Sequence, residues 1–139
     1  MLRVSQLGVL VVVAFFSAPV PAADLFGAIA YSDKTKAHGW ANDYPSRAAA
    51  EKAAIGGCAK HAADCRSVLW FKNACGALAI GPNGVGWDWA DDQAMADRRA
   101  INACAKNSKA CTVKQRICTA DRRPAAAPKK QPGKDKSTK

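Results

Sequence analysis

The apolar and polar positions along the chain fall into two similar series of elements. Short apolar runs separated by turn residues predict one β-hairpin over residues 24–43 and another over 76–92. The second hairpin has the stronger turn signal, because Asn83-Gly84 tolerates the positive φ angles of a tight turn. An Ala-rich stretch of helical character follows each hairpin, and a further strand follows each helix. The predicted unit is therefore hairpin, helix and strand, and it occurs twice.

The two predicted helices have clear starts and small side chains. Ser46 is the predicted N-cap of the first helix, and Asp91 or Asp92 that of the second. The pair Gly56-Gly57 is expected to end the first helix, and the second is expected to run to about Cys104. Because alanine dominates both helices, we expect them to pack closely on a sheet over a thin core.

An alignment of the chain with itself supports a duplication. The aligned segments are 27–43 with 76–92 and, after a three-residue excess in the first copy, 47–65 with 93–111. Of the 36 aligned pairs 14 are identical, among them Trp40 with Trp89 and Asp43 with Asp92. We therefore expect an α+β fold of two tandem hairpin–helix–strand repeats related by a pseudo-two-fold axis, with an antiparallel sheet and two helices.

The first 23 residues have the pattern of a secretory signal peptide. Arg3 precedes a short apolar run from Leu7 to Phe16, and small residues follow as far as Ala23. The run is shorter than a membrane-spanning helix requires, so no transmembrane segment is expected after processing. The expected organisation is a signal peptide (1–23), a folded domain (24–120, with repeats of about 25–74 and 75–119) and a tail (121–139). The expected location is the periplasm or the outside of the cell.

Six cysteines lie in the expected mature part, and an even number in an exported chain predicts disulfides. Their C-x6-C spacing differs from the closer pairs of zinc sites, so neither a metal nor a cofactor is expected. The repeat favours three of the many pairings that six cysteines allow: Cys58–Cys65, Cys104–Cys111 and Cys75–Cys118. The last pair is expected to tie the first copy to the second.

The charge is distributed unevenly along the chain. The formal net charge is +10, of which residues 121–139 carry +5 and residues 24–120 carry +4. The tail has three prolines and no large apolar side chain, so we expect it to be disordered. Its attraction to an anionic envelope surface would be electrostatic and sensitive to salt, and it supports no specific role with nucleic acid.

Several segments together carry a family resemblance. GAIAYS, YPSRAAAEKAA, WFKNACGALA and GVGWDWA, with both C-x6-C loops and the terminal Cys118, resemble the bacterial DUF4189 family over residues 25–119. The resemblance implies a small disulfide-bonded α+β domain of exported bacterial proteins, some mycobacterial members of which are regarded as effectors. It implies no assigned activity and no catalytic residues.

The sequence contains no nucleophile motif and no phosphate-binding loop. Asp43, Asp88 and Asp92 are the carboxylates that would suit a glycan hydrolase, but capping of helix N-termini explains Asp43 and Asp92 more simply. His38 on a hairpin strand and His61 in a disulfide loop are expected to be exposed or to serve packing.

Three tryptophans form the candidate interaction surface. Trp40, Trp87 and Trp89 lie on the second strands of the hairpins, where exposed rings would suit a protein or glycan partner. Because the core is otherwise built from alanine, inward packing of these rings is the favoured interpretation. Strand alternation also places Trp70 and Phe71 on opposite faces, so one of the two is expected to be partly exposed.

These observations favour a non-enzymatic exported interaction domain, with a secreted effector as one form of it. Two other classes remain open: a small hydrolase of cell-wall glycan, and a polyanion-binding or envelope-binding protein acting through the basic tail.

Overall fold

The computed structural model describes residues 21–122. Most of the expected signal peptide, up to residue 20, and the basic tail from residue 123 lie outside the described residues. The elements follow in this order: β1 (Phe26–Tyr31), β2 (His38–Tyr44), α1 (Arg47–Ala59), β3 (Arg66–Lys72), β4 (Cys75–Ile80), β5 (Val85–Ala90), α2 (Gln93–Ala105), β6 (Thr112–Cys118) and the 3₁₀ helix η1 (Ala120–Arg122).

The strands form two antiparallel sheets of three strands each. In the first sheet β1 lies between β2 and β3, and in the second β4 lies between β5 and β6. The fold is therefore α+β, as predicted, with the expected antiparallel sheet divided in two. The division falls at Asn73 and Ala74, where the chain leaves β3 at the edge of one sheet and enters β4 at the centre of the other.

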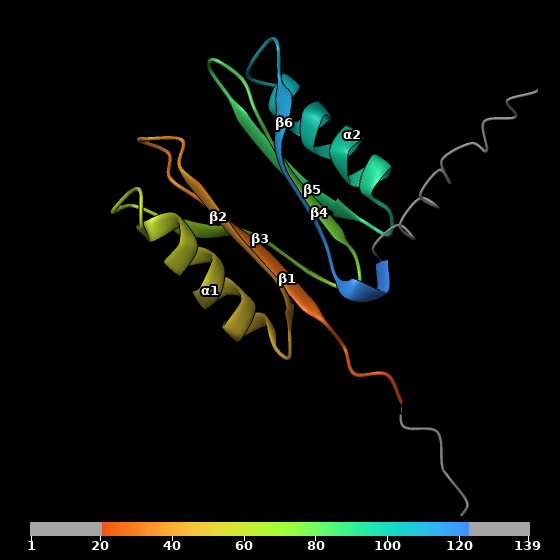
Figure 1. The fold of residues 1–139 in the computed structure, drawn as a ribbon. Coiled ribbons are helices and arrows are strands. Elements are labelled where there is room, and N and C mark those ends of the chain that lie inside the picture. Colours follow the sequence, from red (N-terminus) through yellow and green to blue (C-terminus); the bar gives the residue numbers. More distant parts are fainter. Residues whose placement is uncertain (1–20, 123–139) are drawn as a thin grey trace, which may run out of the picture.

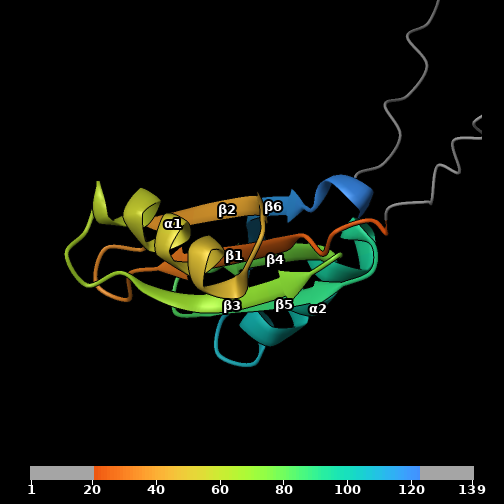
Figure 2. The same ribbon diagram turned by 90° about the horizontal axis from the view of Figure 1, so that it is seen from below.

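The helices cover the outer faces of the two sheets, and the inner faces pack against each other. Figure 1 shows the layers in the order α1, first sheet, second sheet and α2. Each helix buries two alanines and a cysteine on its sheet: Ala50, Ala54 and Cys58 of α1, and Ala96, Ala100 and Cys104 of α2. Such small side chains allow the close approach that the sequence predicted. Both ends of the described chain lie at one end of the molecule (Figure 2).

The caps of the helices agree with the prediction, but the end of the first helix does not. Ser46 Oγ accepts a hydrogen bond from the Ala49 N–H at 3.2 Å, and Asp92 Oδ1 accepts one from the Met95 N–H at 2.9 Å. The prediction that Gly56-Gly57 ends α1 is wrong, because the helix continues to Ala59. The helix is retained there because its packing on β2 outweighs the low helix propensity of two glycines.

Phe71 occupies the centre of the interface between the sheets. Its side chain is 1% exposed and packs with Ile29, Tyr31, Leu78 and Ile117. Two glycines make room for the ring, Gly27 from β1 and Gly76 from β4, since a Cβ at either position would overlap it. The neighbouring Trp70 is 39% exposed, so the prediction that these two side chains point to opposite faces is confirmed.

The structure has the three cysteine pairs that the repeat favours. Cys58–Cys65 and Cys104–Cys111 each join the last turn of a helix to the segment before the next strand. Cys75 and Cys118 face each other as paired residues of β4 and β6 and form the third disulfide. The expectation that this pair ties one copy to the other is wrong, because Cys75 already belongs to the second sheet.

Hydrogen bonds also connect segments that lie far apart in the sequence. Asp43 Oδ1 of the β2 strand accepts a bond from the Ala120 N–H at 2.6 Å. The Thr119 N–H donates to the Ala74 carbonyl at 3.0 Å, and Lys36 Nζ donates to the Pro82 carbonyl at 2.9 Å. Together with the buried residues around Phe71, these bonds hold the sheets against each other.

Strand register changes the alignment of the two copies. Trp40 lies opposite Ile29, whereas Trp87 lies opposite Leu78, which the gapless alignment matches to Ile29. Trp40 therefore corresponds to Trp87, and its alignment with Trp89 is wrong. The three-residue excess of the first copy is divided between two places. Two of the residues lengthen the turn of the first hairpin, and the third forms a bulge in the β1–β2 pairing. The pseudo-two-fold relation itself stays a prediction.

Candidate functional site

The three tryptophans of the candidate surface do not share one site. Trp40 is 50% exposed and Trp89 is 45% exposed, so the inward packing expected of them is wrong. Trp87 is half-buried and packs against the cluster around Phe71. Trp40 and Trp89 stand on edge strands, β2 and β5, so solvent reaches their rings from the open side of each sheet. Trp89 is the member of this set that lines a mainly apolar pocket beside β3.

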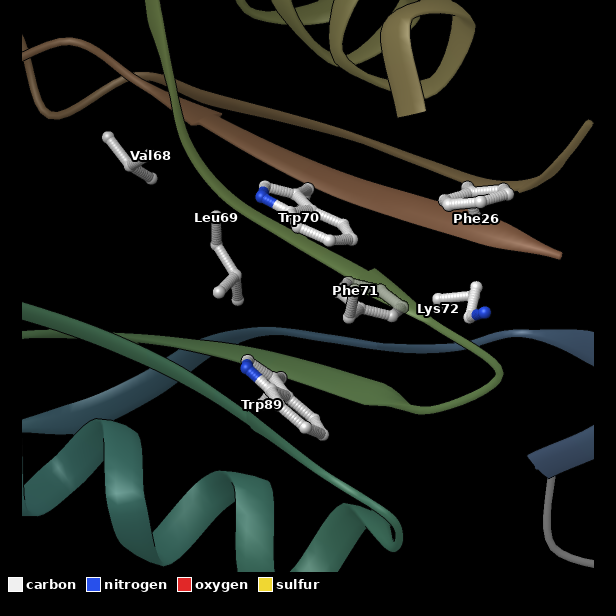
Figure 3. A pocket seen from close by; sticks show the side chains of 7 residues that line it. All are labelled: Phe26, Val68, Leu69, Trp70, Phe71, Lys72 and Trp89. Atoms are coloured by element: carbon white, nitrogen blue, oxygen red, sulfur yellow. The ribbon is translucent and has the colours of Figure 1, made fainter. Parts of the chain in front are cut away.

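This pocket is a groove of about 620 Å³ beside β3. It is lined by Phe26, Val68, Leu69, Trp70, Phe71, Lys72 and Trp89. Figure 3 shows Trp70 and Trp89 on opposite sides, with Leu69 and Phe71 between them. The volume falls within the range of ligand-binding clefts, roughly 300–1,000 Å³. We call this pocket the aromatic groove.

The aromatic groove follows the open edge of a sheet. β3 is an edge strand, bonded to β1 on one side only. Residues 68–72 are consecutive and all line the groove. Leu69, Trp70 and Phe71 alternate between the two faces of the strand, so a pocket that touches all three reaches both faces and the edge between them. Among the described residues no backbone hydrogen bond joins the free edge of β3 to another strand.

Aromatic rings from three strands form the walls of the aromatic groove. The ring centroids of Phe26 on β1 and Trp70 on β3 lie 6.5 Å apart with the planes tilted, a common geometry for aromatic pairs. The Arg47 guanidinium lies 4.6 Å from the centroid of the Trp70 ring, within cation–π range. Arg47 also pairs with Glu51 of α1 at 3.3 Å. Trp70 is thus held in place from its α1 side, while Trp89 forms the opposite wall.

A cation stands at each end of β3. Lys72 pairs with Asp24 at 3.2 Å, and Arg66 pairs with Asp33 at 3.0 Å. A hydrogen bond from Asn73 Nδ2, together with Lys72, lowers the pKa of Asp24 below its usual range. These pairs are exposed to solvent, so each contributes little to stability and is readily exchanged for another anionic partner. Lys72 is the charged residue that lines the aromatic groove itself.

The candidate carboxylates serve local structure. Asp43 accepts hydrogen bonds from Asn42 and from the Ala120 backbone, and the cap of α1 is Ser46, so its predicted role as a cap is wrong. The reason is the three-residue excess of the first copy, which places Ser46 directly before α1 in the position that Asp92 has before α2. Asp88 accepts a bond from the Trp89 N–H at 2.8 Å, and Asp92 caps α2 as predicted. None of the three lines the aromatic groove.

The two histidines line a second and more polar pocket. His38, Trp40, Lys60 and His61 surround about 400 Å³ beside the end of α1, together with Gly39 and Gly57. His38 is half-buried and His61 is exposed. Within residues 21–122, no group of three metal-ligating side chains comes together.

Sequence reasoning missed Phe26, Leu69 and Trp70 as members of a site. The alternation of Trp70 with Phe71 showed that one ring would be partly exposed, but not which one. That choice depends on the second sheet, which covers Phe71 and leaves Trp70 beside an open edge. The aromatic groove forms where β3 of the first sheet meets β5 of the second. These strands are far apart in the sequence, so local patterns do not predict which of their residues come together.

The comparisons with known proteins identify the family of this chain. The model of the family described as "Domain of unknown function (DUF4189)" matches residues 26–118, and the chain belongs to this family. Protein Rv1269c of Mycobacterium tuberculosis and Protein Mb1300c of Mycobacterium bovis are each 48% identical to it over 59 residues. That match covers 42% of this chain and 44% of each relative, so it spans less than half of either protein.

No solved structure matches the chain. No helix between residues 21 and 122 is long and apolar enough to cross a membrane.

Proposed function

We propose that this domain is an exported binding module and that the aromatic groove is its ligand site. The observation that carries the proposal is the pairing of Trp70 and Trp89 across an open strand edge. Rings that are 39% and 45% exposed lose apolar contact with water when a ligand covers them. A cleft of this size with aromatic walls is a favourable place for a ligand.

The distribution of polar groups favours binding over hydrolysis. A glycan hydrolase of the usual kind needs two carboxyl groups facing the substrate, roughly 5–10 Å apart. The lining of the aromatic groove contains no carboxylate, and Asp43, Asp88 and Asp92 are engaged with backbone or side-chain donors.

A titration followed by ¹⁵N–¹H NMR tests this function. The oxidised protein is titrated with three ligand sets in turn: aromatic fragments, short peptides and cell-wall oligosaccharides. We expect the amide signals of residues 68–72 and the indole signal of Trp89 to shift with at least one set. Signals that stay unchanged in the aromatic groove with every set, or shifts confined to the pocket around His38 and His61, would contradict the proposal. Cleavage of an oligosaccharide during the titration would favour the hydrolase instead.

Export is a separate part of the proposal. The amino-terminal pattern and three disulfides in a small domain support it. We expect the protein from its native cell to begin near Asp24 and to resist thiol alkylation until it is reduced. A cytoplasmic protein that keeps residues 1–23 and six free thiols would show that this part is wrong.

A further inference from the structure

We infer that the ligand of the aromatic groove is an extended peptide that adds to the free edge of β3 as a fourth strand of the first sheet. This inference rests on the proposed function and specifies its ligand. It depends on three features of β3: the chemistry of its edge, the shape of the aromatic groove and the charges at its ends.

The middle of β3 differs in charge from the other edge strands of the described chain. β6 carries Lys114 and Arg116, and β5 carries Asp88, all charges that discourage pairing with a further strand. The edge strand β2 is bulged around Asp43, which also bonds to Ala120. β3 also has a bulge, at Val68, but its residues 67–71 read Ser-Val-Leu-Trp-Phe without a charge, and Leu69–Lys72 pair regularly with β1. The regular, uncharged edge beyond the bulge is a template for another strand.

The shape of the aromatic groove suits a peptide better than a sugar. Lys72 is its one charged lining residue, and apart from it the lining offers mainly apolar side chains. Sugar hydroxyls require several polar partners, and the lining side chains do not supply them. An added strand instead bonds to the free backbone N–H and C=O groups of β3, while its alternate side chains reach Trp70 on one face and Trp89 on the other. The four regular residues Leu69–Lys72 match about 13 Å of extended peptide.

The charges at the ends of β3 distinguish a peptide from a second copy of this chain. If two β3 strands paired antiparallel over their full length, each Arg66 would lie opposite a Lys72 of the other copy. Like charges directly opposite each other destabilise a strand pair. A peptide with an apolar centre and acidic ends instead places a carboxylate beside each cation. The exposed partners Asp33 and Asp24 are weakly held and give way readily.

The test begins with random heptapeptides displayed on phage and selected on the oxidised full chain. We expect enriched peptides with apolar residues at alternate positions and Asp or Glu near the ends. Each is then synthesised with one backbone nitrogen methylated at a time, which removes a single donor and keeps the side chain. For an added strand, methylation at alternate positions weakens binding about tenfold or more, whereas methylation at the positions between them has a much smaller effect.

Two variants of the protein locate the peptide. Trp89→Ala and Trp70→Ala are each expected to weaken binding about tenfold, the size of a typical aromatic anchor. Trp40→Ala is the matched control, because Trp40 is at least as exposed as Trp70 and Trp89 and lies in a different pocket. It is expected to bind as the parent does. Circular dichroism checks that all three variants fold.

Each other outcome overturns the inference in a recognisable way. If no heptapeptide is enriched while aromatic fragments or oligosaccharides still shift the signals of the aromatic groove, the binding function stands and the peptide is wrong. Selected peptides that tolerate methylation at every position, or that Trp40→Ala weakens, show that β3 does not receive a strand. Concentration-dependent dimerisation that Trp89→Ala abolishes identifies a second copy as the occupant. If nothing binds the aromatic groove, both proposals fail.

Discussion

The packing of Phe71 between two glycines predicts that substitutions at Phe71 and Gly76 have non-additive effects on the free energy of unfolding. Gly76→Ala places a methyl group where the ring of Phe71 already lies, with a Leu69 methyl 3.2 Å from the new Cβ. Overpacking of this kind costs about 1–3 kcal/mol of unfolding free energy. Phe71→Leu alone leaves a small cavity in a side-chain cluster that is fully buried, and costs about 1 kcal/mol or somewhat more.

The two changes together are nearly neutral in volume. Shortening Phe71 makes room for the methyl group introduced by Gly76→Ala, so the double variant is expected to lose at least about 1 kcal/mol less than the sum of the single losses. The assay is urea unfolding of the oxidised proteins, followed by far-ultraviolet circular dichroism.

Gly56→Ala is the control for the glycine substitution. No atom lies within 4 Å of a Cβ at Gly56, which is in α1 and exposed to solvent. That variant is expected to gain up to about 1 kcal/mol from helix propensity. Two results would refute the arrangement described for Phe71. One is a double variant whose loss of unfolding free energy equals the sum of the losses of Phe71→Leu and Gly76→Ala within about 0.5 kcal/mol. The other is a Gly76→Ala variant that is as stable as Gly56→Ala.

Three further predictions follow from individual contacts. Ser46→Ala removes the cap of α1 and is expected to cost about 1 kcal/mol in urea unfolding, whereas Ser46→Asp keeps the acceptor and costs less. Replacing both cysteines of a disulfide by serine is expected to cost more unfolding free energy when the disulfide closes a longer loop. The expected losses are about 4 kcal/mol for Cys75–Cys118, with a sequence separation of 43, and about 2.5 kcal/mol for Cys58–Cys65, with a separation of 7. Equal losses for the two disulfides would contradict this expectation. A hydrogen bond from Ser32 lowers the pKa of Asp64, so its stabilisation is present above about pH 4 and is lost as the pH falls through the lowered value. Asp64→Asn should therefore be less stable than the parent at pH 7, with a difference that shrinks in acid, and a constant difference from pH 7 to pH 2 would contradict this.

Local signals in the sequence predict much of this fold. Ser46 and Asp92 are recognisable caps because a short side-chain acceptor before an Ala-rich run satisfies a free N–H group of the helix. The alternation of Trp70 and Phe71 is equally local, since two successive residues of a strand must face opposite sides.

Contacts between distant residues account for what the sequence does not predict. The role of Asp43 depends on Ala120, which is 77 residues away. That Cys75–Cys118 lies within one sheet depends on where the chain changes sheets, and the residues before Cys75 carry no mark of that change. The candidate site shows the same division: the sequence indicated Trp89, but only the meeting of β3 and β5 brings Trp70 to the same groove.

Hydrogen exchange in β3 tests the central claim most directly. In the free protein the N–H groups that face β1 are protected by the ladder, whereas those of Val68–Lys72 on the open edge are expected to exchange rapidly. Addition of a selected peptide is expected to slow exchange at the open-edge amides of β3 and to leave those of β2 unchanged. Protection that appears near His38 and Trp40, or binding that leaves every β3 amide as fast as before, would contradict the assignment of this edge as the ligand site.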